Sequence, residues 1–346
     1  MQTLTKPATH KRISNSSPPR NSWGPSTRKR PNIAAMVTTK DLVVVGSLNC
    51  DLVLPVKRVP LPGETLAADG MDTVPGGKGA NQAAGAAKLG HPTHFIGQIG
   101  TDANASLLRA SLQEAGAKLQ HLREVPGPSG TAIIILQSNG ENSIIIVGGA
   151  NQAEWSLSEA AKEEVSKAGA VLLQREIPEH VNIEVAKLAK AANVPVYMDA
   201  GGMEGPLDPQ ILACLTLLSP NETELNRLTN MPTENEEQIE AAARMLQGMG
   251  VEAVLVKLGA DGSLFLPGKG QAPIRQKAIK AEKVLDTTGA GDCFTAAYTV
   301  AILEGMDTKA ALQFASAAGS ICVQRAGAMP SMPSRADVKA LLAATK

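Results

Sequence analysis

The sequence predicts an α/β fold in which a doubly wound, mostly parallel sheet is flanked by helices and carries a small β-sheet lid. From Asp41 onward, short runs of Val, Ile and Leu alternate with Ala-rich helical stretches, which is the pattern of βαβ units. Hydrophobic residues make up 43% of the 346 residues, yet no apolar run reaches the length of a membrane span. We therefore expect a soluble globular protein that makes no membrane contact.

The main sheet is predicted from continuous apolar runs, because strands that are buried on both faces lack polar alternation. The first strand covers residues 41–46. The other runs that fit buried strands, each followed by turn or helix-start residues, are 170–174, 195–199, 215–218 and 253–258.

The lid is predicted from two segments that do not fit βαβ units. Residues 131–137 and 143–147 flank an Asn139-Gly140 pair, which suits the positive φ angles of a tight hairpin. Residues 52–75 are broken by Pro55, Pro60, Pro62 and Gly63 and are too long for an ordinary loop. We expect these segments, about 52–75 and 131–147, to form a small sheet within one domain at 41–346.

Residues 1–40 read as a separate leader. They contain eight Lys or Arg residues, no Asp or Glu and no apolar h-region, so they match a transit peptide better than a secretory signal. We expect this leader to be disordered and to direct the chain to the plastid (chloroplast) stroma, with the mitochondrion as the alternative. Three other interpretations of the leader stay open: an unimportant tail, a nuclear signal at residues 27–31, and a cytoplasmic form initiated at Met36.

The charge balance and the cysteines exclude several classes of protein. The whole chain has 33 basic and 33 acidic residues, but without the leader 25 basic residues face 33 acidic ones, which disfavours nucleic-acid binding. The four cysteines are far apart, and the five histidines do not cluster near them in the sequence. Neither a zinc site nor disulfides are implied, and reduced thiols in an intracellular compartment are expected.

A glycine-rich stretch at 286–292 predicts a phosphate site. Gly289, Ala290 and Gly291 precede a helix-compatible run, so their backbone N–H groups can approach a phosphate at the helix N-terminus. Asp292 would repel that phosphate, but it can act as the base that takes a proton from an attacking hydroxyl. Taken alone, Asp292 fits a helix N-cap equally well.

A second glycine-rich stretch at 76–83 predicts a site for a polyhydroxy ligand. It lacks the spacing and the hydroxyl of a P-loop, and the dinucleotide fingerprint is also absent. Lys78 and Asn81, with Asn49 and Asp51 after the first strand, offer the donors and acceptors that a sugar needs. Each of these residues singly is also explained as a turn or cap residue.

Together, the stretches at 76–82 and 286–292 resemble the two signatures of the PfkB family of carbohydrate kinases, and the likeness covers residues 41–340. The resemblance implies transfer of the terminal phosphoryl group of ATP to the 5-hydroxyl of D-ribose, giving ADP and a sugar phosphate for pentose phosphate and nucleotide metabolism. It further implies Mg²⁺ bound with ATP, K⁺ as an activating cation, and a homodimer. The alternatives are another sugar kinase of the family, acting on deoxyribose or a keto-deoxy sugar, and a catalytically inactive scaffold.

The resemblance also assigns residues to roles. Asp292 is implied as the catalytic base, with Gly289, Ala290 and Gly291 as the anion loop. The implied sugar contacts are Asn49, Cys50, Asp51, Gly77, Lys78, Gly79, Ala80, Asn81, Glu176 and Asp292. The implied ATP contacts are Asn221, Lys257, Leu258, Gly259, Ala260, Asp261, Gly262, Gly291 and Ser316. Glu224 is implied to hold Mg²⁺ through water, and the implied K⁺ site comprises Asp286, Thr288, Cys322, Arg325, Gly327 and Ser331.

Three positions depart from the family pattern. Ser316 stands where many members have Asn near adenine, Arg175 precedes Glu176 where an apolar residue is common, and residues 199–202 replace an Asn-Pro-Ala-Pro run. The implied adenine contact of Ser316 is therefore the least supported of the set.

Overall fold

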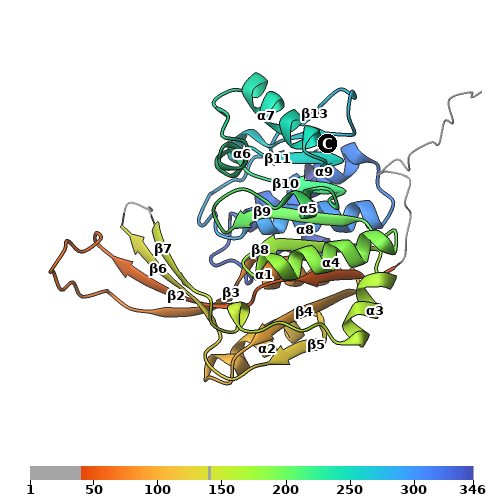
Figure 1. Ribbon diagram of the computed structural model, residues 1–346. Coiled ribbons are helices and arrows are strands. Elements are labelled where there is room, and N and C mark those ends of the chain that lie inside the picture. Colours follow the sequence, from red (N-terminus) through yellow and green to blue (C-terminus); the bar gives the residue numbers. More distant parts are fainter. Residues whose placement is uncertain (1–39, 139–141, 346) are drawn as a thin grey trace, which may run out of the picture. The chain divides into compact units, whose positions relative to one another are not determined.

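The computed structural model describes residues 40–138 and 142–345. Within this part of the chain, nine strands form the main sheet, and the seven from β11 to β5 are parallel, whereas β12 and β13 add to one edge in antiparallel pairs (Figure 1). From one edge to the other, the strands are β13 (Ile274–Gln276), β12 (Ser263–Leu266), β11 (Ala253–Lys257), β10 (Leu217–Ser219), β9 (Val196–Gly202), β8 (Ala170–Arg175), β1 (Leu42–Val45), β4 (Thr93–Ile99) and β5 (Lys118–Glu124).

Helices cover both faces of this sheet and enclose two hydrophobic cores. One core is shared with α1 (Lys78–Lys88), α2 (Asn104–Glu114), α8 (Ala290–Leu303), α9 (Thr308–Cys322) and α10 (Arg335–Ala344). The other is shared with α3 (Glu159–Lys167), α4 (Glu179–Ala191), α5 (Pro209–Leu212), α6 (Glu222–Thr229) and α7 (Glu236–Gly248).

Strand β1 shows why the core strands read as unbroken apolar runs. Leu42 and Val44 pack into the first core, whereas Val43 and Val45 pack into the second, and all four side chains are fully buried. Because successive side chains of a strand point to opposite faces, a strand covered on both sides has no position that faces solvent, and every side chain of β1 is apolar. The predicted doubly wound sheet is therefore confirmed.

The small sheet contains β3 (Asp72–Gly76), β2 (Asn49–Val56), β6 (Gly130–Gln137) and β7 (Asn142–Val147), in that order. β2 follows β1 after residues 46–48, and its first residue, Asn49, pairs with Gly76 just before α1 begins. The base of the small sheet therefore lies at the carboxyl ends of the main strands, the edge at which open α/β sheets bind ligands. This separate sheet confirms the predicted lid.

The predicted strands at 41–46, 131–137, 143–147, 170–174, 195–199, 215–218 and 253–258 are all found, with ends shifted by at most three residues. β4, β5, β12 and β13 were not predicted, because polar residues interrupt them or because they are short. The leader and the Asn139-Gly140 turn lie outside the described residues. Among the helices that the structure describes, none combines the length and the apolar character of a membrane span.

Candidate active site

Asp292 lies buried in the first turn of α8, at the carboxyl edge of the sheet. The helix begins after Gly289, whose φ of 77° and whose position against Ala328, where a Cβ would come within 2.9 Å of Cα, both require glycine. Burial raises the pKa of Asp292 to about 6, although the nearby Lys78 ammonium opposes the shift. A carboxylate with this pKa is ionised at neutral pH and is basic enough to accept a proton.

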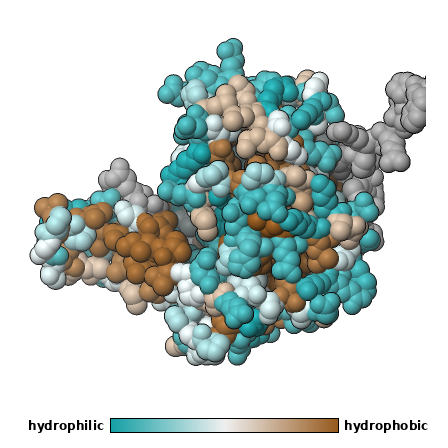
Figure 2. Space-filling model, in the orientation of Figure 1, coloured by the Kyte–Doolittle hydropathy of each residue, from teal (hydrophilic) through white to brown (hydrophobic). Residues whose placement is uncertain are grey.

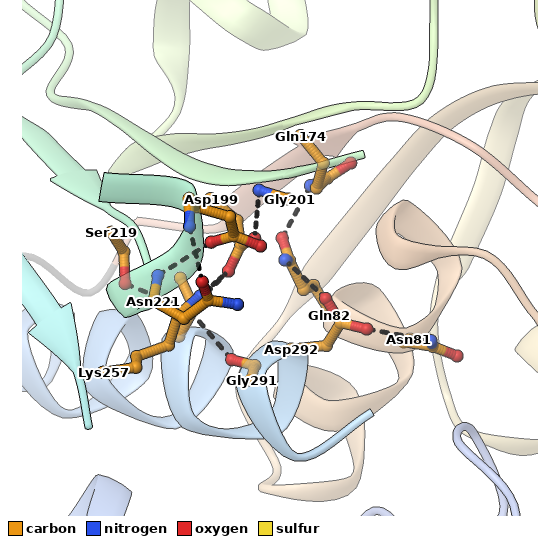
Figure 3. Close-up of polar contacts among 12 residues, drawn as sticks. Asn81, Gln82, Gln174, Asp199, Gly201, Ser219, Asn221, Lys257, Gly291 and Asp292 are labelled. Atoms are coloured by element: carbon orange, nitrogen blue, oxygen red, sulfur yellow. Dashed lines mark hydrogen bonds and ion pairs between the residues drawn. The ribbon is translucent and has the colours of Figure 1, made fainter. Parts of the chain in front are cut away.

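Two amides from α1 hold the Asp292 carboxylate. Asn81 Nδ2 donates to Oδ2 at 3.0 Å and Gln82 Nε2 donates to Oδ1 at 3.1 Å, as Figure 3 shows. The oxygen of Gln82 in turn accepts a hydrogen bond of 2.6 Å from Nε2 of Gln174, near the end of β8. Because the oxygen of Gln82 faces Gln174, its NH₂ group faces Asp292. The carboxylate is therefore held by two donors from the other glycine-rich stretch, and one of them, Asn81, lies 211 residues away in the sequence.

Further acids gather beside Asp292. Burial, together with the charges of Glu176 and Asp292, raises the pKa of Asp51 to about 7. Asp51 lies over Gly76, where a Cβ would come within 2.0 Å of its carboxylate, so only glycine fits beneath it. Glu176 accepts hydrogen bonds from Ser47 Oγ at 2.6 Å and from the backbone N–H of Lys78 at 3.0 Å.

Lys78 is the cation of this group. It is the first residue of α1, after Gly77 with a φ of 88°, and its chain reaches toward Gly201 of β9, where an added Cβ would lie 2.7 Å from Nζ. The charge of Asp292, followed by those of Asp199, Glu176 and Glu224, raises the pKa of Lys78 despite burial. An ammonium among buried carboxylates can balance charge on a bound anion and on the acids themselves.

The remaining predicted sugar contacts are placed as follows. Asn49 Oδ1 accepts a hydrogen bond of 2.7 Å from Asn151, which also binds the backbone of Leu48. Gly79 packs against the backbone of residues 46 and 47 so closely that a Cβ would come within 2.6 Å. The side chains of Cys50 and Ala80 lie in the first hydrophobic core, so only their backbone atoms are available to a ligand.

An ion pair lies on the other side of Asp292. Asp199 is buried, and its Oδ2 accepts hydrogen bonds from Lys257 Nζ at 2.5 Å and from Thr295 Oγ1 at 2.9 Å (Figure 3). A Cβ on Gly291 would lie 3.6 Å from the same Lys257 ammonium. Lys257 therefore lies beside the anion loop, where a phosphate would be within reach of its charge.

Asn221 and Glu224 form a reciprocal capping box at the start of α6. Asn221 Oδ1 accepts a hydrogen bond from the N–H of Glu224 at 2.8 Å, and Glu224 Oε2 accepts one from the N–H of Asn221 at 2.8 Å. Both side chains are thus fixed at the end of β10, and Glu224 is close enough to Lys78 to raise its pKa. A partly exposed carboxylate of this kind suits Mg²⁺ held through water.

The predicted nucleotide loop follows β11. Leu258 is buried and its N–H donates to Gly262 O at 2.8 Å, whereas residues 259–261 form an exposed 3-10 turn, η3 (Gly259–Asp261). Ser316, by contrast, lies buried in α9, and its Oγ accepts a hydrogen bond of 2.9 Å from the N–H of Ile279. The hydroxyl of Ser316 therefore positions the 277–279 segment.

The predicted K⁺ residues come together in two adjoining loops. Asp286 accepts hydrogen bonds from the N–H groups of Thr288 at 2.9 Å and Gly327 at 2.8 Å, which joins the 286–289 loop to the 322–331 loop. In the second loop, the Cys322 thiol lies 3.0 Å from Ser331 Oγ. The Arg325 guanidinium donates to Asp337 at 3.0 Å and takes no part in the implied K⁺ site, whose ligands are mostly backbone carbonyl oxygens.

Sequence reasoning missed several polar residues of the site. The residues that were missed are Ser47, Gln82, Asn151, Gln174, Asp199 and Thr295. Lys257 was predicted as an ATP contact, but its ion pair with Asp199 was not predicted. Gln82 and Ser47 directly adjoin predicted residues and were within reach of the same motifs, whereas Asn151 and Thr295 carry no local signal.

The comparisons with known proteins agree on one family. The model of the pfkB family carbohydrate kinases matches residues 39–335. The curated ribokinase of Arabidopsis thaliana is 50% identical over 324 residues, covering 92% of this chain and 85% of its own, and that of Bacillus subtilis is 35% identical, covering 88% and 99%. A solved structure of Arabidopsis thaliana ribokinase complexed with ribose and ATP matches with a TM-score of 0.84 at 51% identity, covering 88% of this chain and 98% of that one.

Proposed function

The chain belongs to the pfkB family of carbohydrate kinases, and from this membership we propose that it transfers the γ-phosphoryl group of ATP to the 5-hydroxyl of D-ribose, giving ribose 5-phosphate and ADP. The observation that carries the proposal is Asp292: a buried carboxylate with a pKa of about 6, at the start of a helix and oriented by two amides. No inactive scaffold would need to retain this arrangement.

The sugar side of the mechanism uses the acids and amides around Asp292. Asp51, Glu176 and Asn49 accept hydrogen bonds from ribose hydroxyls, and Lys78 and Asn81 donate to ribose oxygens. Asp292 takes the proton of the 5-hydroxyl as that oxygen attacks. An analogue that lacks one hydroxyl leaves a buried polar group unpaired, which disfavours its binding.

The phosphate side uses the start of α8. The N–H groups of residues 289–291 and the ammonium of Lys78 stabilise the charge of the transferred group, and Lys257 and Asn221 contact the nucleotide. Glu224 would hold Mg²⁺ through water, and the ion bound with ATP would supply positive charge that neutralises the phosphates. The exposed 259–262 turn lies beside the nucleotide.

A sugar panel tests the substrate. We expect kcat/KM for ADP release to be higher with D-ribose than with 2-deoxyribose, fructose or a keto-deoxy sugar, each assayed with and without K⁺. Faster turnover of any other sugar would reassign the substrate and favour another kinase of the family. Absence of turnover with every sugar would favour the inactive scaffold.

We propose that K⁺ activates the enzyme from the two loops joined by Asp286 and Gly327. The carboxylate of Asp286 links the two loops and supplies a balancing charge, and backbone carbonyl oxygens of these loops would be hard ligands that suit an alkali cation. A cation there would order the 286–289 loop and so the anion loop that follows it. Equal rates in K⁺ and in a tetramethylammonium salt would remove this site from the proposal.

The pH profile of the reaction follows from Asp292. The carboxylate is the active form, and because burial raises its pKa to about 6, we expect kcat/KM to fall about tenfold per pH unit below that pH and to level off above it. A coupled assay from pH 5 to 8 at subsaturating ribose measures this limb. A flat profile down to pH 5 would contradict the role of Asp292.

We propose a homodimer formed through the small sheet. Leu136 of β6 and the consecutive residues 144–147 of β7 are all more than a third exposed, with Ile145 at 55%, and they give the apolar patch in Figure 2. A patch of this kind marks an interface, and a second copy offers the same apolar surface.

Substitution tests the dimer. We expect Ile145→Glu to convert a dimer to a monomer in sedimentation analysis across a concentration series, because a charge would be buried in an apolar contact. Met245→Glu, at an exposed methionine of α7, is the control. A wild-type chain that sediments as a monomer at all concentrations would contradict the proposal.

We propose that residues 1–40 are a transit peptide for the plastid stroma and that residues 41–346 form the kinase domain. The support is the cationic, acid-free composition of the leader. Imaging of fluorescent fusions beginning at Met1 and at Met36 tests it, and identical diffuse signals would contradict it.

A further inference from the structure

We propose that the chain has a second metal site, for Zn²⁺ or a similar divalent transition metal, built from His94, His121 and Glu164 with Asp41 as a fourth ligand. One ligand atom from each of the first three residues lies within 4.8 Å of the others, and no cation is assigned there by the kinase chemistry. The four residues come from the segment before β1, from β4, from β5 and from α3.

An irregularity in the sheet brings the two histidines to one face. In the pairing of β4 with β5, His94 is opposite Lys118, but Ile96 is opposite His121, so β5 has one extra residue at this point. Without that residue, His121 would lie on the face opposite to Lys118, because strand side chains alternate. The bulge thus turns His121 toward α3, where Glu164 lies.

The distances between the ligand atoms suit a tetrahedral ion. Zinc bonds of 2.0–2.1 Å to nitrogen or oxygen place tetrahedral ligands about 3.4 Å apart. His94 Nε2 lies 2.9 Å from Asp41 Oδ2 and 3.4 Å from Glu164 Oε1, and His121 Nε2 lies 3.8 Å from Glu164 Oε2. These three distances, from 2.9 to 3.8 Å, lie on either side of the tetrahedral value, so the contacts are compatible with one shared ion.

The chemistry and accessibility of the set also fit. Zinc binds both imidazole nitrogen and carboxylate oxygen, and this set offers two of each. The two carboxylates also carry negative charge that a divalent cation would neutralise. The histidine side chains are only 10% and 12% exposed, which limits competition from water. His121 also lines a cavity of about 250 Å³ beside residues 155–158, which offers a path for the ion.

Lys118 competes through its ammonium with a metal ion for Asp41 and His94. Its ammonium pairs with Asp41 and lies 3.2 Å from His94 Nε2, so it holds the place of a cation. Its side chain is 41% exposed and flexible, so it can swing into solvent when an ion enters. Removal of this charge should therefore strengthen metal binding.

The site lies at the opposite edge of the sheet from Asp292. Asp41 and His94 are at the amino ends of β1 and β4, and Asp292 lies beyond the carboxyl ends, on the order of 20 Å away by strand rise. The metal would thus join α3 to β1, β4 and β5 without entering the reaction. The proposed ligands are spread from residue 41 to residue 164, so they form no sequence motif from which the site could be predicted.

Titration with ZnCl₂ tests the site, using the tag-free full chain in a non-chelating buffer without nucleotide. We expect one equivalent to bind by calorimetry, and Co²⁺ in its place to give the intense visible bands of a tetrahedral complex. His121→Ala and Glu164→Gln should each weaken binding by at least about tenfold. The matched controls are His180→Ala, at an exposed histidine, and Glu163→Gln, whose carboxylate pairs with Lys167; both should bind as wild type.

Two further variants keep the test decisive. Lys118→Met should bind Zn²⁺ several-fold more tightly, and Asp292→Asn should bind it unchanged, which separates this site from the active-site acids. Kinase activity retained by Glu164→Gln shows that the variant is folded. The proposal is overturned if wild type binds no equivalent, if His121→Ala and Glu164→Gln bind as wild type does, or if Lys118→Met binds more weakly.

Discussion

Asp292→Asn should reduce kcat by a factor of about 100 or more while ribose still binds. The amide cannot accept the proton of the 5-hydroxyl, and a positioned base contributes at least this much to the rate. The fold should tolerate the change, because Asn81 can turn its own amide and offer Oδ1, an atom without a partner among the described residues, to the new NH₂ group. Rapid-quench turnover and calorimetric titration with ribose measure the two effects.

The control for Asp292→Asn is Asp307→Asn. Asp307 caps α9 by accepting from the N–H of Ala310 at 2.9 Å, and Asn is as good a cap as Asp. We therefore expect Asp307→Asn to keep wild-type kcat. If Asp292→Asn also kept it, Asp292 would be only a residue of the first helical turn, and another group would have to act as the base.

Lys78→Met should lower kcat on the order of 100-fold and also move the pH profile. The substitution removes a cation from the transferred phosphoryl group, which costs as much as loss of an oxyanion donor. The same ammonium opposes the raised pKa of Asp292, so without it that pKa should rise above about 6 and the acidic limb of kcat/KM should shift to higher pH.

A second lysine separates the charge effect from general damage. Lys167→Met removes an exposed ammonium that pairs with Glu163 within α3, and it should change neither kcat nor the pH profile. A loss of rate in Lys78→Met without any shift of the limb would mean that Lys78 acts on the phosphate alone. An unchanged rate would remove it from the mechanism.

The sequence was sufficient for those parts of the fold and site that are encoded locally. The strands β1, β8 and β11 are encoded as continuous apolar runs. The two glycine-rich stretches each lead into a helix, and they carry Lys78 and Asn81 at the start of α1 and Asp292 at the start of α8. Strand alternation alone could have shown that the Cys50 side chain faces away from Asn49 and Asp51, but the prediction followed the motif instead.

The rest depends on which strands become neighbours. The hydrogen bond from Gln174 to Gln82 joins residues 92 apart, and the pair of Lys257 with Asp199 joins residues 58 apart. Nothing in either local sequence indicates the partner, because the contacts exist only once β8, β9 and β11 take their places around β1. β4 was missed for a related reason: its polar His94 and Gln98 break the apolar run although the strand is fully buried.

The central place of β1 determines when activity can arise during synthesis. This strand leaves the ribosome early but lies between β4 and β8, and α1 packs on α8, which is made more than 200 residues later. Until α8 has emerged, a nascent chain holds Lys78 without Asp292, the residue proposed as the base. Truncation between residues 277 and 289 would therefore leave all nine strands of the main sheet but remove α8 and α9, which exposes the apolar face that these helices cover.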